Sequence, residues 1–207
     1  MKKTFLLIMA FAFMFVGTHA QSSQVEAVSQ LSKAEQFKLK NSFIKETEIY
    51  KSQGSLANTI RISAKIFTDL KSKEETAALE FYPSKAVKVF AGLAGVNPNE
   101  ILPLGYLDMD RIDDLLLALE TILSECKNSN KKDNFTISYC APGGIDVSYT
   151  TLGDMVLFRK KWYAIDDYGT QTSKYSEGSA ACRIADLPQV IESIKEAKVI
   201  ANQALAK

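Results

Sequence analysis

The sequence predicts an α+β protein: antiparallel sheet with two amphipathic helices packed on one face, arranged as two tandem halves of strands followed by a helix. Three observations lead to this class. Residues 60–66 alternate apolar and polar side chains, which is typical of a half-buried strand. Short apolar runs between residues 133 and 185 are separated by glycine-containing turns, which favours an antiparallel meander. Leucine and isoleucine then recur at helical spacing after Asp108, and apolar residues do so again after Asp186.

The N-terminal segment, residues 1–20, has the layout of a secretory signal peptide. Two lysines precede an uncharged apolar run at residues 5–16, and small residues stand at Thr18 and Ala20. The apolar run is too short for a spanning helix. We therefore expect cleavage near Ala20 and a secreted or periplasmic protein.

Residues 21–41 are polar with weak helical spacing, and predict a loosely attached helix or a flexible lead-in. The first half of the fold, residues 42–128, then opens with strands. The β-branched, alternating character of strands appears in four runs, at residues 43–50, 58–70, 76–83 and 101–107. The strongest amphipathic helix of the chain follows, with its apolar stripe at Ile112, Leu115, Leu116, Leu119, Ile122 and Leu123.

The second half, residues 133–205, is a run of short strands before a helix. The strands are predicted at residues 134–141, 145–152, 155–159, 162–169 and 179–185, with turns at Gly143-Gly144, at Gly153 and at Lys160-Lys161. The helix has its apolar stripe at Leu187, Val190, Ile191, Ile194, Ala197, Ala201 and Leu205. Setting Asp108 on Asp186 aligns the two halves with a shift of 78 residues and suggests a duplication.

Four aspartates crowd in front of the first predicted helix, at Asp108, Asp110, Asp113 and Asp114. They do not fit an EF-hand loop, because the sixth position is not glycine and the twelfth is not glutamate. A carboxylate at a helix start accepts backbone N–H bonds and meets the positive end of the helix dipole. We therefore interpret Asp108 or Asp110 as the cap of the first helix and Asp186 as the cap of the second. The alternative is a paired-carboxylate site of the glycosidase kind.

The chain has three cysteines, Cys126, Cys140 and Cys182. In an exported protein one pair can oxidise and leave one thiol over. Cys140 and Cys182 fall in predicted strands that are candidates for neighbours, so we expect a disulfide between them. The alternative interpretation is that all three are small buried apolar side chains.

Aromatic residues gather in the second half. Alternation places Trp162 and Tyr168 on one face of their strand, with Tyr149 on a strand predicted to be its neighbour and Asp166 close by. Together they are a candidate platform for a sugar or a peptide. Aromatic side chains are also ordinary strand residues, so sheet packing is the alternative.

The composition excludes several chemistries. His19 is the single histidine, and it lies in the segment expected to be removed, so a Ser–His or Cys–His nucleophile pair and a His-containing zinc site are excluded. Without residues 1–20 the chain has 23 basic and 24 acidic residues, and this near-neutral overall balance gives no electrostatic footprint for nucleic acid or an anionic membrane. We expect no catalytic residue, no metal, no cofactor, no nucleic-acid partner and no transmembrane segment.

Three stretches carry a resemblance to known proteins: GYLDMDRIDDLLLALETI at residues 105–122, APGGIDVSYTT with KWYAI, and IADLPQVIESIKEA at residues 184–197. They resemble a loose group of small exported proteins of Bacteroidetes-type bacteria. The resemblance spans roughly residues 43–200 and implies no activity and no functional residues. The tandem halves also look like those of Whirly-type single-strand binders, but export and near-neutral charge argue against that function.

These observations favour an exported, non-catalytic binding or interaction protein whose partner is a protein, a peptide or a glycan. Two alternatives belong to other classes. A carboxylate-dependent glycan hydrolase requires two carboxylates about 5–10 Å apart in one cleft. A carrier of lipids or other hydrophobic ligands requires a closed apolar cavity of at least about 300 Å³.

Overall fold

The structure is a computed structural model, and it confirms the α+β class with antiparallel sheets. It describes residues 31–52, 60–83, 104–128, 135–141, 145–151, 154–165 and 171–207, with the backbone alone in 162–165 and 171–178. Two four-stranded antiparallel sheets follow one another along the chain, in the orders β1-β2-β3-β4 (sheet 1) and β5-β6-β7-β8 (sheet 2). In the described part of the chain, no helix is long and apolar enough to cross a membrane.

Sheet 1 consists of β1 (Ile44–Lys51), β2 (Ile60–Asp69), β3 (Glu75–Pro83) and β4 (Gly105–Asp108). Alternation along β2 points Ile60, Ile62 and Ala64 into the main core. The opposite face of the sheet is also partly covered. Phe67 of β2 and Ala78 of β3 are buried there beneath a short helix, α2.

Helix α2 (Lys33–Lys40) lies in the stretch predicted to be a loose helix or lead-in, and it is firmly attached. Its N-cap Ser32 and Glu35 form a complete capping box, in which each side chain accepts the other residue's backbone N–H. Glu35 also pairs with Lys160 of sheet 2. Capping and packing on Phe67 therefore hold this short helix, which is too short to be stable alone.

Sheet 2 consists of β5 (Thr136–Cys140), β6 (Ile145–Thr150), β7 (Met155–Ile165) and β8 (Gln171–Arg183). The turn expected at Lys160-Lys161 is wrong, because β7 runs through it and pairs with β8 along its whole length. The register shifts between Arg159 and Lys161, which marks a bulge. Pairing with β8 overrides the local polarity of two adjacent lysines.

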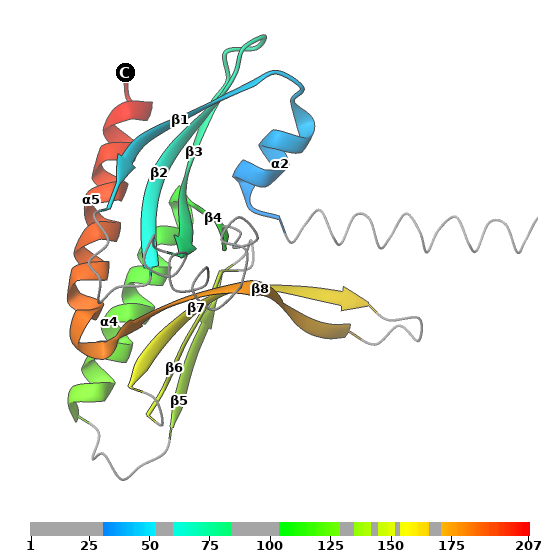
Figure 1. Cartoon of the computed structure of the whole chain (residues 1–207). Helices are drawn as coiled ribbons and strands as arrows, with labels where there is room; N and C mark the ends of the chain where they lie inside the picture. The colour runs from blue at the N-terminus through cyan, green and yellow to red at the C-terminus, as the bar shows by residue number, and fades with distance from the viewer. Residues whose placement is uncertain are drawn as a thin grey trace, which may run out of the picture.

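Each half ends in a short 3₁₀ turn and a long helix. The turn Met109–Arg111 leads into α4 (Ile112–Asn128), and the turn Ile184–Asp186 leads into α5 (Leu187–Leu205). Helix α5 contacts β1, β2 and β3 of sheet 1, whereas α4 contacts β5 of sheet 2. In Figure 1 the two helices lie together along one side of the sheets. Each half therefore uses the helix of the other half as a cover.

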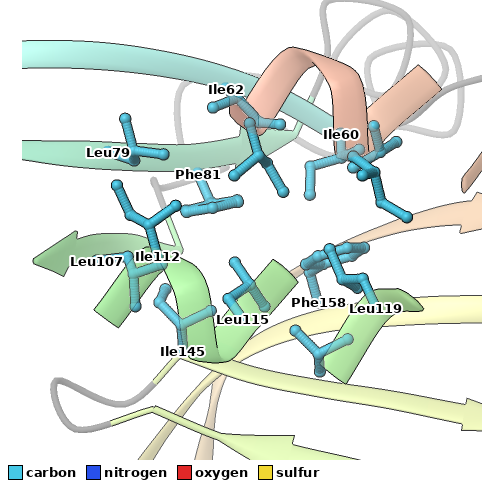
Figure 2. Close-up of a cluster of buried hydrophobic side chains, with 14 of the residues drawn as sticks. Ile60, Ile62, Leu79, Phe81, Leu107, Ile112, Leu115, Leu119, Ile145 and Phe158 are labelled. Carbon is cyan, nitrogen blue, oxygen red and sulfur yellow. The ribbon is translucent and has the colours of Figure 1, made fainter. Parts of the chain in front are cut away.

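One continuous core joins the halves. Figure 2 shows side chains of sheet 1, α4 and sheet 2 converging, with Phe81 of β3 and Phe158 of β7 among them. These two rings stack with centroids 6.2 Å apart and planes 14° apart. Phe81 pairs with Gly105 of β4 and Phe158 with Ala180 of β8, three residues before the end of each last strand. The stacked rings thus occupy equivalent positions in the two halves.

The structure supports a tandem architecture but corrects its alignment. The end of the last strand, the 3₁₀ turn and the start of the helix align along the sequence when Ile112 is set on Leu187, a shift of 75 residues rather than 78. In this alignment every buried residue of α4 corresponds to a buried residue of α5. A slip of three residues keeps the apolar stripe of a helix nearly in place, so the sequence pattern does not separate the two shifts. Asp186 consequently corresponds to Arg111, not to Asp108.

The expected Cys140–Cys182 disulfide is not present, because all three cysteines are free thiols. Cys140 lies on β5 and Cys182 on β8, the two outer strands of sheet 2, so two strands separate them. That spacing is about 14 Å, well beyond the 7 Å limit between bridged Cα atoms. Cys182 is buried in the core, and burial raises the pKa of its thiol to about 12.

Candidate functional site: a polar pocket between β1 and α5

A pocket of about 430 Å³ opens where the end of β1 meets α5. Its walls come from two segments far apart in the sequence. The lining residues are Tyr50 and Lys51 from β1 and Gln189, Glu192, Ser193 and Glu196 from α5. The lining is therefore rich in carboxylate, hydroxyl, amide and ammonium groups, and Tyr50 supplies an aromatic ring.

Helix periodicity places the four α5 residues on one stripe. Gln189, Glu192, Ser193 and Glu196 are spaced by three or four residues, so they lie one above another on the helix. The neighbouring stripe, which includes Ile191 and Ile194, is buried in the core. Burial of that apolar stripe therefore fixes the direction of the polar stripe toward the end of β1.

A bulge at Ile49 directs the side chain of Tyr50 toward α5. The register of β1 on β2 shifts between Glu48 and Tyr50, so Ile49 is an extra residue in the strand. Tyr50 then reaches α5, and its hydroxyl donates to Oε2 of Glu196 at 3.0 Å. Burial, followed by this hydrogen bond, raises the pKa of Tyr50 above its ordinary value of 10.0. Tyr50 is therefore protonated at neutral pH and acts as a donor.

The pocket carries surplus negative charge. Glu192 and Glu196 contribute two carboxylates to the lining. The ammonium of Lys51, which also lines the pocket, lies 3.0 Å from the carboxylate of Glu48, which does not. The hydrogen bond to Glu48 raises the pKa of Lys51, so that lysine stays charged and paired. Lys195 lies between Glu192 at 3.4 Å and Glu120 of α4 at 3.1 Å, so its charge is shared. The charge of the pocket is therefore complementary to a cationic group.

Strand β1 borders the pocket and is an outer strand of sheet 1. Within the described ranges it pairs with β2 and with no other strand. An outer strand presents backbone N–H and C=O groups that can pair with another chain. The pocket thus combines a polar cavity with an edge suited to strand addition.

The predicted aromatic platform is not assembled by the described residues. Tyr149 is on β6 but faces the core with 5% of its surface exposed, and its ring lies 5.9 Å from that of Phe135. A hydrogen bond with the thiol of Cys126, together with burial, raises the pKa of Tyr149 to about 12. Tyr149 therefore presents no face to a ligand. Trp162 belongs to β7 by its backbone, and its side chain lies outside the description, as do Asp166 and Tyr168.

Two of the three aspartates predicted as caps occupy N-cap positions. Asp108 is the N-cap residue of the 3₁₀ turn before α4 and Asp186 that of α5, but neither side chain makes a cap hydrogen bond there. Asp186 Oδ2 instead accepts from Arg183 at 2.9 Å, and Asp110 pairs with Lys33 at 2.7 Å.

Asp108 serves α2. Its Oδ2 accepts the backbone N–H of Lys33 at 2.9 Å and its Oδ1 that of Ala34 at 3.4 Å. These are the first N–H groups of α2, so a carboxylate from 74 or 75 residues away satisfies them. Burial raises the pKa of Asp108, against the opposing effect of the two N–H donors.

A network of charged residues occupies the outer face of sheet 1. Lys65 pairs with Glu80 at 2.9 Å and with Glu46 at 3.6 Å, and Glu46 also pairs with Lys38. Burial, followed by the charge of Glu80, raises the pKa of Tyr106 to about 12. The charges of this network pair with one another beneath and beside α2, so its role is structural.

A second pocket, of about 310 Å³, lies between the end of α4 and the start of α5 and is mostly apolar. Leu123, Ile184 and Pro188 are among its lining residues. It opens to solvent, so it lacks the closure that a lipid carrier requires. No group of three or more potential metal ligands occurs among the residues that the structure describes.

Comparison with protein-family models, with curated proteins and with solved structures gives no match in any of the three. The sequence reasoning missed the pocket because its two walls meet only in the tertiary structure. Tyr50 and Glu196 are 146 residues apart. A local signal did exist, since Gln189, Glu192, Ser193 and Glu196 form a polar stripe of their own beside the apolar one.

Proposed function

We propose that this is an exported, non-catalytic binding protein that recognises an extended peptide segment carrying a basic side chain. The peptide adds to the outer edge of β1, and its basic side chain enters the pocket between β1 and α5. The observation that carries the proposal is the position of an acidic pocket directly beside an outer strand.

The two features supply different parts of recognition. Backbone pairing with β1 provides affinity for any extended chain, and the pocket selects among side chains. Two carboxylates from one helix stripe, with a tyrosine hydroxyl held by one of them, suit a lysine or arginine head group. Export is supported by the basic and apolar arrangement of residues 1–20. Mass spectrometry of the chain from the envelope fraction of its host tests it, because a chain that still begins at Met1 contradicts cleavage.

A hydrolytic role has less support in the same geometry. Glycoside hydrolysis needs one carboxyl group kept protonated by its surroundings and a second one kept ionised. Glu192 and Glu196 are both exposed on one helix face, and the Glu192 side chain is 73% exposed and paired with Lys195. Neither carboxylate is therefore enclosed in the kind of cleft that surrounds a glycosidic bond.

Fluorescence anisotropy tests the proposal with the chain from Gln21 to Lys207. The probe is a labelled peptide of alternating threonine and valine with one central lysine, compared with the same peptide carrying norleucine or glutamate there. We expect the lysine peptide to bind at least about tenfold more tightly than the glutamate peptide, because one charge-assisted contact is worth that much. Methylation of alternate backbone nitrogens on the peptide should abolish binding, since it removes the donors that pair with β1.

The matched variants are Glu192→Gln/Glu196→Gln and Glu125→Gln. Glu125 is an exposed acid on α4 that does not line the pocket. The double variant should lose the preference for lysine, and the Glu125 variant should keep it. Equal affinity for all three peptides, or preferential retention of oligosaccharides over peptides, would show that the proposal is wrong.

A further inference from the structure

We propose that the protein docks on anionic phospholipid bilayers through an apolar tip formed by Leu39, Phe43 and Leu70. This interface is separate from the peptide pocket and does not depend on it. The tip lies at the end of sheet 1 where β1 begins and β2 turns into β3, the end that points away from sheet 2 (Figure 1).

Three large apolar side chains stand out in solvent here. Leu39 is 71% exposed, Phe43 60% and Leu70 40%. Leu39 is in the last turn of α2, Phe43 is the residue before β1, and Leu70 is in the turn after β2. The backbone N–H of Leu70 donates to the carbonyl of Phe43 at 2.9 Å, so those two residues are adjacent. Single exposed apolar residues are common on proteins, but a group of them at one protruding end marks a contact surface.

The turn that presents Leu70 is firmly held. Asp69 Oδ1 accepts the backbone N–H of Lys71 at 3.0 Å, and its Oδ2 accepts the Ser72 hydroxyl at 2.8 Å. The backbone N–H of Lys73 closes the turn on the carbonyl of Asp69 at 2.9 Å, with Lys73 in the left-handed region at φ 63°. A turn fixed in this way presents its side chains without an ordering cost at the moment of contact.

Lysines surround the apolar tip. Lys40, Lys45, Lys71 and Lys73 are exposed. The ion pairs formed by the described residues use other lysines, such as Lys38 and Lys65, and none of these four. The acids nearest in sequence are Asp69, whose carboxylate accepts the hydrogen bonds of the turn, Glu74, which is exposed, and Glu75, whose carboxylate accepts from the Thr68 hydroxyl. Glu46 follows Lys45 but pairs with Lys38 and Lys65. The four lysines outnumber Asp69, Glu74 and Glu75, so the charge around the tip is net positive.

This combination fits a lipid surface better than a protein groove. Apolar side chains at a protruding end enter the boundary between head groups and acyl chains, and lysines around them meet anionic head groups. Charge complementarity therefore selects the partner as a bilayer containing anionic phospholipid. Strand β1 runs from the tip to the polar pocket, and its eight residues hold the pocket on the order of 25 Å from the tip.

Vesicle co-sedimentation tests the inference with the chain from Gln21 to Lys207, which contains every described element and omits the apolar residues 5–16. Vesicles of phosphatidylcholine with phosphatidylglycerol are compared with vesicles of phosphatidylcholine alone. We expect binding to the mixed vesicles that weakens as salt rises. Phe43→Ser/Leu70→Ser should lower the partition coefficient by about tenfold or more. Lys40→Gln/Lys73→Gln should reduce the difference between the two vesicle types.

Leu117→Ser is the matched control, because Leu117 is an apolar residue of α4 with 66% of its surface exposed, away from the tip. It should bind vesicles like the unaltered chain. Absence of vesicle binding, or equal binding by the unaltered chain and Phe43→Ser/Leu70→Ser, would overturn the inference. So would self-association of the free protein that this double variant removes, since the tip would then join two copies of the chain. Peptide binding is measured on the same variants, and its loss or survival bears on the pocket alone.

Discussion

At the scale of single residues, the Asp108 side chain accepts hydrogen bonds from a different helix than the one its position in the sequence predicts. Its position before a leucine-rich stripe predicts a cap for the helix that follows. The folded chain instead places its carboxylate on the first N–H groups of α2. Capping is a matter of which orphan donors lie within about 3 Å, and the tertiary structure brings those of α2 closer.

Removal of the Asp108 carboxylate should loosen α2. We expect Asp108→Ala to lower the free energy of unfolding by about 1–2 kcal/mol, because two N–H groups lose their acceptor. Asp108→Asn keeps one acceptor oxygen and should cost clearly less. Urea unfolding followed by circular dichroism measures both. Equal losses in the two variants would show that the carboxylate's hydrogen bonds to α2 do not contribute to stability.

The same residue gives stability a pH dependence of known sign. Burial raises the pKa of Asp108 above its ordinary value of 3.8, so the folded state binds this proton more tightly than the unfolded state. Its contribution is therefore present below the ordinary value and is lost as pH rises through the raised value. The stability of the unaltered chain relative to Asp108→Asn should increase as pH falls through this window. A difference that is constant, or that falls with decreasing pH, would contradict the assignment.

At the scale of elements, the helices are exchanged between the halves. The apolar stripes of α4 and α5 are plain in the sequence, but a stripe does not say which sheet it will cover. Helix α5 covers sheet 1, which is built from residues far before it in the chain. Shape and volume decide this choice, because side chains from both sheets must interdigitate at crystal-like density around Phe81 and Phe158.

The exchange of helices predicts which sheet loses local stability when a buried side chain of α5 is truncated. Ile194 is fully buried, and Ile194→Ala should lower the free energy of unfolding by about 2–5 kcal/mol. Hydrogen exchange should then rise more in β1–β3 than in β5 and β6, although α5 follows sheet 2 in the chain. Val199→Ala, at an exposed position of the same helix, is the control. A rise concentrated in sheet 2 would rule out the exchanged arrangement.

At the scale of the whole molecule, the two tandem halves are repeats in architecture but not independent domains. Each sheet lacks its cover without the other half, and one core runs through both. The stacked pair of equivalent phenylalanines lies at the junction of the two sheets. We therefore expect the two halves to fold as one unit.

Separated halves should not fold. We expect residues 31–128 alone to show no cooperative thermal transition, because sheet 1 would expose the apolar face that α5 covers. Coexpression with residues 129–207 should restore a soluble complex with the circular dichroism of the intact chain. Size-exclusion chromatography and thermal melts measure both outcomes. Cooperative folding of the first half by itself would show that the exchange of helices is not required.

Much of the fold could be predicted from local patterns. Period-two alternation in residues 60–66 and the apolar stripes of the two long helices identify strands and helices, because half-buried strands and helices each impose a fixed spacing on apolar residues. The α+β class follows from their order. Local patterns failed at Lys160-Lys161, where pairing with β8 outweighs a polar dipeptide, and at the repeat alignment, where a slip of three residues leaves a helical stripe almost unchanged.

The sequence by itself determined most of the elements and the antiparallel class, since these depend on composition and on neighbours within one or two turns of chain. Only the tertiary structure decided that α5 covers sheet 1, that Cys140 and Cys182 lie on opposite outer strands, and that Tyr50 meets Glu196 across 146 residues. The physical reason is the distance along the chain over which each interaction acts. Periodicity reports which face of an element is buried, whereas the partner of that face is set by side-chain packing between segments that lie far apart along the chain.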